Sequence, residues 1–414
     1  MYVIGFILGL FAIIILKTLL EYCKDEKYGK QYKEVENFRN CKDQLYKIIH
    51  VRYGCRPKPI YEILLDRKNI FQESFKILKK MPESSLLPNN IIKIKYKDEK
   101  CDDLGGITRE WITSLIDEFF ATRNQLFYFL NDDLTEMFPI DKELIRENDL
   151  AYYKFLGKII GRMIVSKVNA NVKLHTIIWK QILDLSCDNT DFEKVDPLFY
   201  KNFTSLKEDP KTLIDLRTTF SENDFEFIKN GKNILVNEEN INLYIDEYLK
   251  YKYVTKIDEQ IGEIKNGLFE IIPKYCLNTF DENSFKMLIC GAEKINMKNW
   301  IQNTTYENYN SKEKVIIWFW DIVKSFTDEE KTLLVHFVTG SNKVPGGGFE
   351  DLTGMREENK KFTVAKIACD HDKILPFART CTNTLLLPEY SSKKKLKEKL
   401  LFAINECREG FEIF

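Results

Sequence analysis

The chain has 414 residues, more than one ordinary hydrophobic core accommodates, so about two or three domains are expected. Its 62 basic and 63 acidic residues leave a net charge of −1, and the lack of a basic field argues against nucleic-acid binding as a main activity. A hydrophobic content of 44% with 13% aromatic residues excludes a disordered chain and predicts a packed interior.

The N-terminal segment is a nearly continuous apolar run from Tyr2 to Leu16, broken by Lys17. From Met1 to Leu20 the segment has about the 20 residues that a helix needs to cross a bilayer. We therefore predict a transmembrane anchor over residues 1–20. A cleaved signal peptide and a buried core helix are the alternatives, but the run has neither the positive start nor the small-residue cleavage site of a signal peptide. Lysines follow the run, which predicts a single-pass protein with its body in the cytosol. In the opposite orientation, Asn202 and Asn303 would be glycosylation acceptors.

Residues 21–60 are polar and charged and end at Pro57 and Pro59. This composition predicts a partly helical stalk without a site. We expect the body from about residue 58 onward to fold and act without the anchor and the stalk.

The patterned body begins near Ile60. Residues 91–96 alternate as a strand does, and the helical spacing of Ile107, Trp111, Leu115 and Phe119 predicts a helix with one buried face. A second helix is predicted over residues 152–162, where glycines 157 and 161 indicate close helix packing.

The second half of the body changes character twice. Residues 185–265 are mixed and carry aromatic side chains in a polar neighbourhood, whereas the polar, asparagine-rich residues 298–310 are typical of a hinge. The pattern of residues 311–414 predicts a separate unit with helices over 315–326 and 328–337, short strands and a last helix. That helix follows Pro388, with Ser391 or Ser392 as its cap and an apolar face formed by residues 396, 400, 401 and 404.

Among ten cysteines, Cys381 has the most distinctive surroundings. The cysteines form no Cys-x-x-Cys pair and no Cys/His cluster at zinc spacing, so we predict no metal site and favour a reducing compartment. Most free cysteines are buried and inert, and Cys290 and Cys369 have the apolar neighbours of such residues. Cys381 instead stands between Thr380 and Thr382, followed by Asn383, which favours a turn with the sulfur near the surface. The pattern indicates a thiol that carries a covalent intermediate.

Several short segments together resemble the HECT-type ubiquitin ligases. The segments keep the order and spacing of that family across roughly residues 61–414. Each segment is weak evidence alone, and the resemblance rests on all of them together. They are Leu104-Gly105-Gly106-Ile107-Thr108-Arg109-Glu110-Trp111, Phe155-Leu156-Gly157-Lys158-Ile159-Ile160-Gly161, Trp318-Phe319-Trp320, Phe337-Val338-Thr339-Gly340-Ser341, Val344-Pro345, Gly348-Phe349, Leu375-Pro376, Thr380-Cys381-Thr382-Asn383 and Leu387-Pro388-Glu389-Tyr390.

The resemblance implies a bilobal α+β fold behind the transmembrane helix. A mainly helical N-lobe would cover residues 61–304, with a small subdomain at about 185–265 that binds the ubiquitin-conjugating enzyme (E2). The hinge at 298–310 would lead into an α/β C-lobe over 305–414 that carries the cysteine.

The resemblance also implies the chemistry. Ubiquitin would pass from the E2 to Cys381 as a thioester and then to a lysine of a protein substrate, without a metal or organic cofactor. Thr380 and Asn383 match the family motif. Arg379 stands where the family usually has histidine, and Thr382 stands where it has phenylalanine. The effect of these two differences on the rate of ubiquitin transfer is left open. Phe411, fourth from the end, matches a phenylalanine that assists transfer, or else it plugs the core under the last helix.

For the E2-binding groove, the matching positions are Phe199, Phe203, Leu216 and Tyr244. The alternative is that these side chains form the core of their own subdomain. Arg109 and Glu110 are interpreted as an ion pair or a contact between lobes rather than as catalytic groups.

Two other functions remain open at this point. A cysteine hydrolase would need a histidine base, and only His50, His175, His336 and His371 are present, none in a recognisable motif. A catalytically weakened membrane scaffold that binds E2 or ubiquitin is the other alternative, although a scaffold has no need of the Cys381 thiol.

Overall fold

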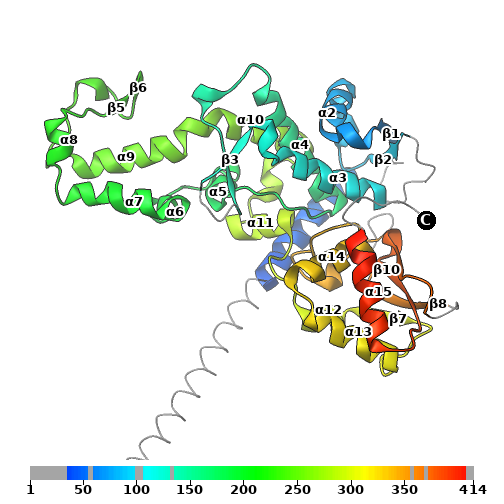
Figure 1. Ribbon diagram of the computed structural model, residues 1–414. Coiled ribbons are helices and arrows are strands. Elements are labelled where there is room, and N and C mark those ends of the chain that lie inside the picture. The colour runs from blue at the N-terminus through cyan, green and yellow to red at the C-terminus, as the bar shows by residue number, and fades with distance from the viewer. Residues whose placement is uncertain are drawn as a thin grey trace, which may run out of the picture.

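The computed structural model of the chain describes residues 35–54, 59–97, 106–130, 135–354, 359–367 and 372–406. These residues build two hydrophobic cores, one from residues between Phe38 and Cys290 and one from residues between Trp300 and Ile404. We call the two parts the N-lobe and the C-lobe. Figure 1 shows the N-lobe as a helical body with an arm that extends to the left, and the C-lobe below the body. The predicted bilobal α+β organisation is therefore present.

The body of the N-lobe is mainly helical with two small sheets. The strands β1 and β2 pair in parallel, β3 and β4 pair antiparallel, and the rest of the body consists of helices. The elements are β1 (Ile60–Leu65), α2 (Ile70–Lys80), β2 (Ile91–Tyr96), α3 (Gly106–Phe119), β3 (Phe127–Phe129), β4 (Met137–Pro139), α4 (Asp149–Ser166), α5 (Thr176–Ile182), α10 (Asp258–Ile271) and α11 (Glu282–Cys290). The predicted strand over 91–96 and the buried face of the following helix are confirmed.

The packing of α4 against α10 depends on glycine. A Cβ added at Gly157 would lie 2.0 Å from the carbonyl oxygen of Ile264, and one added at Gly267 would lie 1.9 Å from that of Lys154. No side chain fits in so short a distance, so the two helix backbones touch directly. The prediction that Gly157 allows close packing is confirmed, and Gly161 does the same against Ile271.

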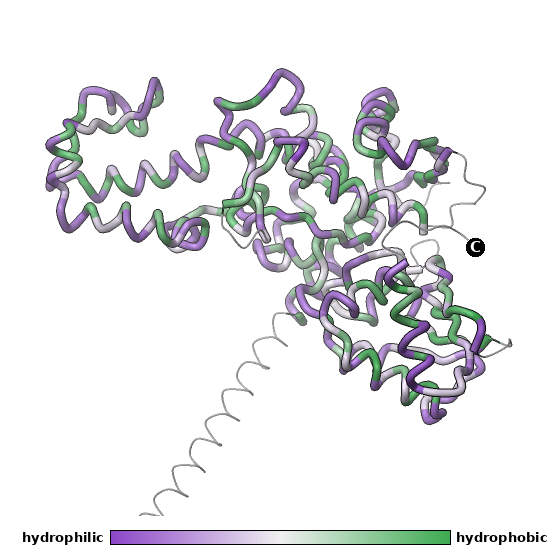
Figure 2. The backbone as a smooth tube through the Cα atoms, viewed as in Figure 1, coloured by the Kyte–Doolittle hydropathy of each residue, from purple (hydrophilic) through white to green (hydrophobic). Residues whose placement is uncertain are grey.

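The arm is a small subdomain between α5 and α10. It contains α6 (Asn189–Val195), α7 (Pro197–Thr204), α8 (Lys211–Asp215), β5 (Ser221–Glu222), β6 (Phe225–Glu226) and α9 (Ile241–Tyr253). Figure 2 shows hydrophilic and hydrophobic residues alternating along its helices. Rings from α7 and α9 meet between the helices: Phe203 lies 4.7 Å from Tyr248, centroid to centroid. The arm is thus held together largely by aromatic contacts.

The C-lobe has one four-stranded sheet, with strand order β7-β8-β10-β9. Strand β8 pairs in parallel with β7 and β10, whereas β9 pairs antiparallel with β10. The elements are α12 (Met297–Gln302), β7 (Thr304–Glu307), α13 (Lys314–Ser325), α14 (Asp328–Thr339), β8 (Phe362–Ile367), β9 (Phe377–Arg379), β10 (Thr384–Pro388) and α15 (Lys393–Glu406). Strand β10 is buried along its whole length. The three predicted helices of this unit are confirmed within a few residues, and Ser392 caps the last of them.

The predicted hinge at 298–310 is corrected by the structure. That segment forms α12 and β7, and Trp300 is fully buried in the core of the C-lobe. Asparagines that suggested a hinge have structural partners instead: the side-chain oxygen of Asn299 accepts from the backbone N–H of Phe349 at 2.8 Å, and that of Asn310 accepts from the backbone N–H of Lys312 at 3.0 Å. The chain passes from one core to the other at residues 291–296, where it has no regular structure.

Residues 35–53 form a helix that contacts both lobes, although the sequence analysis assigned them to a stalk. Phe38, Cys41 and Leu45 are buried at helical spacing. These few apolar residues lie among many charges, which hid the pattern. A body that begins near residue 58 would therefore lose part of the N-lobe core.

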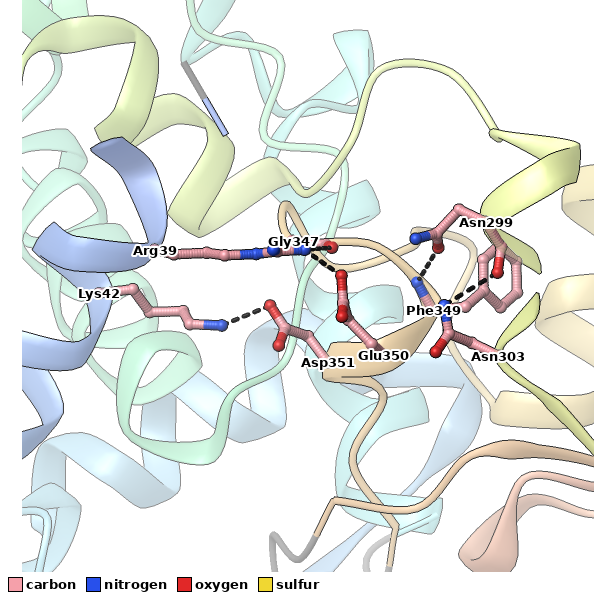
Figure 3. A network of polar contacts seen from close by, with 8 residues as sticks. All are labelled: Arg39, Lys42, Asn299, Asn303, Gly347, Phe349, Glu350 and Asp351. Carbon is pink, nitrogen blue, oxygen red and sulfur yellow. Dashed lines mark hydrogen bonds and ion pairs between the residues drawn. The ribbon is translucent and has the colours of Figure 1, made fainter. Parts of the chain in front are cut away.

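The same helix makes polar contacts with a loop of the C-lobe (Figure 3). Arg39 donates to the carbonyl oxygen of Gly347 at 3.1 Å and pairs with Glu350, and Lys42 pairs with Asp351. On the other side of the loop, the backbone N–H of Phe349 donates to the side chain of Asn299 at 2.8 Å. The loop is thus held from two directions.

The predicted transmembrane fold and single-pass localisation are corrected. No helix in the described ranges is long and apolar enough to cross a membrane. Residues 1–20, on which the prediction rested, lie outside those ranges. Where helices are described, their apolar residues serve protein cores: α4 is 18 residues long, yet it carries Lys154, Lys158 and a buried Arg162 among its apolar positions.

Adding a methyl group at the helix contact should destabilise the N-lobe. We expect Gly157→Ala to lower the free energy of unfolding by about 2 kcal/mol or more, because the backbones of α4 and α10 must move apart. The control is Gly262→Ala on α10, where an added Cβ meets nothing within 4 Å. That substitution should raise stability by about 0.5–1 kcal/mol. Equal effects in denaturant titrations of the two variants would contradict the packing argument.

Candidate functional site

Cys381 occupies the turn of a β-hairpin. Strands β9 and β10 pair antiparallel, with Arg379 opposite Thr384, and the residues between them make one turn of 3-10 helix over Thr380–Thr382. Cys381 is partly exposed there. The prediction of a turn that keeps the sulfur near the surface is confirmed.

Asn383 gives the turn its shape. Its φ of 50° is left-handed, a conformation in which asparagine is favoured among residues with a side chain. The side chain is fully buried and donates to the carbonyl oxygens of Thr353 at 3.0 Å and Lys360 at 2.7 Å. Its own carbonyl oxygen accepts from the backbone N–H of Thr363 at 2.9 Å. The turn is therefore fixed to the neighbouring loop and to β8.

The two residues that depart from the family motif have different surroundings. Arg379 is exposed at the end of β9. The hydroxyl of Thr382 lies 2.9 Å from that of Thr384 and 3.3 Å from the carbonyl oxygen of Arg379. Thr382 thus contributes hydrogen bonds within the hairpin instead of an apolar contact beside the sulfur.

The N-lobe reaches this turn through the beginning of α3. Arg109, which is only 6% exposed, donates to the carbonyl oxygens of Thr339, Thr353 and Thr380 at 2.9–3.0 Å and to the side-chain oxygen of Asn383 at 3.3 Å. The interpretation of Arg109 as a contact between lobes is confirmed. Its neighbour Glu110 instead pairs with Arg67 within the N-lobe.

The other described cysteines have different surroundings from Cys381. Burial raises the pKa of Cys290 and of Cys187 to about 11, and it also raises that of Cys276. Cys41 is buried and donates to the carbonyl oxygen of Thr279. A thiol that must ionise to react is poorly placed at such sites. Cys369 lies outside the described residues.

Two histidines are relevant to the hydrolase alternative. His175 caps α5 within the N-lobe by accepting from the backbone N–H of Ile177 at 3.3 Å. His336 lies on α14, a helix that packs against the Cys381 turn. Within the described ranges no hydrogen bond joins the Cys381 sulfur to an imidazole, and His371 lies outside them. Among the described residues, the geometry therefore shows no hydrogen-bonded Cys–His pair at Cys381.

The four predicted E2-binding residues separate into two groups. Phe199 and Phe203 stack with centroids 5.3 Å apart, and Phe203 lies 6.3 Å from Tyr244. Tyr244 is buried and makes an edge contact with Phe220. Leu216, at the end of α8, is 72% exposed. Tyr244 belongs to the core of the arm, Phe199 and Phe203 are partly buried against that core, and Leu216 belongs to the surface.

Sequence reasoning missed two other exposed leucines of the arm. Leu198 on α7 is 70% exposed and Leu243 on α9 is 49% exposed. In the sequence, each of these two residues is an isolated leucine on the polar side of a helix. Isolated leucines of this kind are ordinary on protein surfaces, so nothing in the sequence marked them as a binding site. Phe411, predicted to assist transfer, lies outside the described residues.

The described residues thus form a helical lobe with an arm and an α/β lobe that presents a cysteine in a hairpin turn. The HECT-domain (ubiquitin-transferase) family matches residues 113–414, and the chain belongs to this family. The resemblance stated from the sequence is thereby confirmed, and so is the class of enzyme.

Individual relatives agree with this membership. The chain is 30% identical over 385 residues to the E3 ubiquitin-protein ligase ptr1 of Schizosaccharomyces pombe, and 33% identical over 361 residues to the E3 ubiquitin-protein ligase TOM1 of Saccharomyces cerevisiae. These alignments cover 91% and 86% of this chain, but only 12% and 11% of those proteins. The E3 ubiquitin-protein ligase Nedd-4 of Drosophila melanogaster is 31% identical, over 93% of this chain and 38% of its own length.

The buried imidazole of His336 should make stability depend on pH. Burial lowers the pKa of His336, and the nearby carboxylate of Glu110 opposes this only in part. The unfolded chain therefore binds a proton near pH 6.5 that the folded protein does not bind until a lower pH. The contribution to stability is complete above the unfolded pKa and is lost as the pH falls through the folded one.

We expect the free energy of unfolding to fall between pH 7.5 and 5.5. The part due to His336 is at most about 1.4 kcal/mol per pH unit below the unfolded pKa. His336→Gln should show a smaller loss in paired denaturant titrations. Identical losses in the two proteins would contradict the assignment, since His175, whose pKa burial also lowers, is present in both.

Proposed function

We propose that this chain is an E3 ubiquitin transferase that carries ubiquitin as a thioester on Cys381. The observation that supports this most strongly is the position of the thiol. It is partly exposed in a hairpin turn whose every other residue is held by hydrogen bonds. A nucleophile that receives and gives up a large protein needs this combination of access and fixed geometry.

The proposed reaction has two steps. In the first, the Cys381 thiolate attacks the carbonyl carbon of the thioester between ubiquitin and the E2 cysteine. The bond from that carbon to the E2 sulfur breaks, and the E2 thiolate leaves. In the second step, a neutral lysine amine of a protein substrate attacks the new thioester. The carbon–sulfur bond breaks, an isopeptide bond forms, and the amine proton passes to water or to the departing Cys381 thiolate.

The residues around the thiol support this chemistry in different ways. Thr380 and Asn383 fix the two ends of the turn, as described above. Arg379 is a permanent cation and cannot accept the proton of the lysine amine. We therefore assign no general base to this turn.

For the E2, we propose a docking surface on the arm rather than the ring cluster itself. Leu216, Leu198 and Leu243 supply exposed apolar contacts, whereas Phe199, Phe203 and Tyr244 hold α7 and α9 together. Exposed apolar anchors surrounded by polar residues are what a transient interface needs.

Replacement of the proposed nucleophile should abolish transfer without unfolding the protein. We expect Cys381→Ala to form no thiol-sensitive ubiquitin adduct on a non-reducing gel with activating enzyme, ATP and a panel of E2s. The matched control is Cys290→Ala, which removes a buried thiol. It should keep the adduct and lose only about 1–2 kcal/mol of stability.

Two results would overturn the proposal. Equal loss of the adduct in well-folded Cys381→Ala and Cys290→Ala would show that Cys381 is not the acceptor. A folded wild-type chain that binds an E2 but never forms the adduct would favour the scaffold alternative.

The docking surface makes a separate prediction about the first step. Leu216→Ala should slow the formation of the Cys381 adduct about tenfold and leave the thermal midpoint nearly unchanged, because the side chain is exposed. Tyr244→Ala should instead lower the midpoint, because it removes a buried ring. An unchanged rate of adduct formation in Leu216→Ala with every active E2 would contradict this docking surface.

A further inference from the structure

We propose that Arg109 is a positioning residue for the second step, the transfer of ubiquitin from Cys381 to lysine. It would act from the N-lobe by holding the Cys381 turn of the C-lobe in the orientation that the attacking amine requires. This inference rests on the proposed function, and it adds a residue outside the C-lobe to the machinery of that step.

The first observation is the set of oxygens around the guanidinium. Within the part of the chain that the structure describes, its four acceptors belong to the C-lobe and are neutral: the carbonyl oxygens of Thr339, Thr353 and Thr380, and the amide oxygen of Asn383. They come from three places in the sequence, namely the last residue of α14, the loop before β8, and the hairpin turn. One buried N-lobe side chain therefore determines how three C-lobe segments lie relative to each other and to α3.

The second observation is where two of those contacts fall. Thr380 and Asn383 are the first and last residues of the turn, and Cys381 lies between them. Arg109 also fixes the orientation of the Asn383 amide, because the oxygen faces the guanidinium while the nitrogen donates to two carbonyl groups. The direction in which the sulfur faces thus depends on a residue of the other lobe.

The chemistry of arginine suits this position. The guanidinium presents five N–H groups in a rigid fork and stays protonated when buried, so it satisfies several carbonyl groups at once. Thr339 ends a 12-residue helix, where the carbonyl groups carry the negative end of the helix dipole. The approach is also sterically tight, since a Cβ at Gly106 would lie 2.6 Å from the hydroxyl oxygen of Thr380.

The placement of the arm indicates which step this contact serves. Figure 1 shows the arm extending from the body on the side away from α3, whereas the hairpin turn packs beside α3. An E2 docked on the arm would approach the turn only if the C-lobe left Arg109. The contact seen here therefore fits the loaded enzyme, in which the E2 is no longer needed and a lysine attacks.

The test compares the two steps in full-length variants. Loading is followed as the single-turnover transfer of labelled ubiquitin from a preformed E2 thioester to Cys381. Discharge is followed as the loss of the preformed Cys381 thioester in excess free lysine, both on non-reducing gels. For Arg109→Gln we expect the ratio of the discharge rate to the loading rate to fall about tenfold, the size of effect that ~1.4 kcal/mol gives.

The matched control is Arg162→Gln. Arg162 is also a buried arginine that donates to backbone carbonyl groups, those of Asn90 and Leu87, but all three residues lie in the N-lobe. It should lose stability without changing the ratio by more than about twofold. Should Arg109→Gln fold poorly, Arg109→Lys keeps the charge without the fork, and its ratio should also fall.

The outcomes separate the two proposals. Wild-type protein that forms no Cys381 thioester would refute the proposed function itself. Wild-type protein that loads normally, with ratios for folded Arg109→Gln and Arg109→Lys within twofold of wild type, would refute the positioning role alone. A ratio that falls as far in Arg162→Gln as in Arg109→Gln would reduce Arg109 to a structural residue.

Discussion

The contact between the start of α3 and the Cys381 hairpin is the interaction on which the arrangement of this molecule depends. The two lobes have separate hydrophobic cores, so their relative position is set by polar contacts between them. A buried guanidinium that satisfies four oxygens is directional, because each N–H must point at its acceptor. Such a contact forms fully in one geometry and leaves a costly buried charge in others. It specifies one orientation of the reactive turn.

The helix over residues 35–53 adds a second and weaker contact that holds the C-lobe against the N-lobe. Arg39 and Glu350 are both 40% exposed, so this ion pair contributes little to stability, whereas the pair of Lys42 and Asp351 is more buried. The helix also inserts Phe38 beside the loop, where a Cβ on Gly346 would meet the phenylalanine ring at 2.8 Å. The described part of the C-lobe is therefore held at the Cys381 turn, at the loop over residues 346–351, and through Ser341, whose hydroxyl donates to the carbonyl oxygen of Asn169 at 3.0 Å.

Sequence reasoning predicted the local features well and the contacts between distant segments poorly. The strand over 91–96, the glycine of α4 and the turn around Cys381 follow from periodicity and turn chemistry, which are properties of neighbours in the chain. The hinge was placed too late, because asparagines that hold folded segments by side-chain hydrogen bonds, such as Asn299 and Asn310, look the same in the sequence as asparagines in a flexible loop.

The errors have the same physical origin. The helix over 35–53 carries only three buried apolar residues among its charges, and its burial is visible only against distant segments of the N-lobe core and the C-lobe loop. Tyr244 and Leu216 belong to one predicted groove, yet one is core and the other surface, which depends on how α7 and α9 pack. The partners of Arg109 lie between 230 and 274 residues away in the chain, beyond the reach of any local pattern.

The central claim is that Cys381 accepts ubiquitin, and mapping of the acceptor atom tests it most directly. Cys381→Ser should trap ubiquitin as an oxyester that survives thiol reductants but not hydroxide. Peptide mass spectrometry should then find the ubiquitin C-terminal glycine attached to the peptide that contains position 381. Attachment at any other residue, or a thiol-sensitive adduct that persists in this variant, would contradict the account.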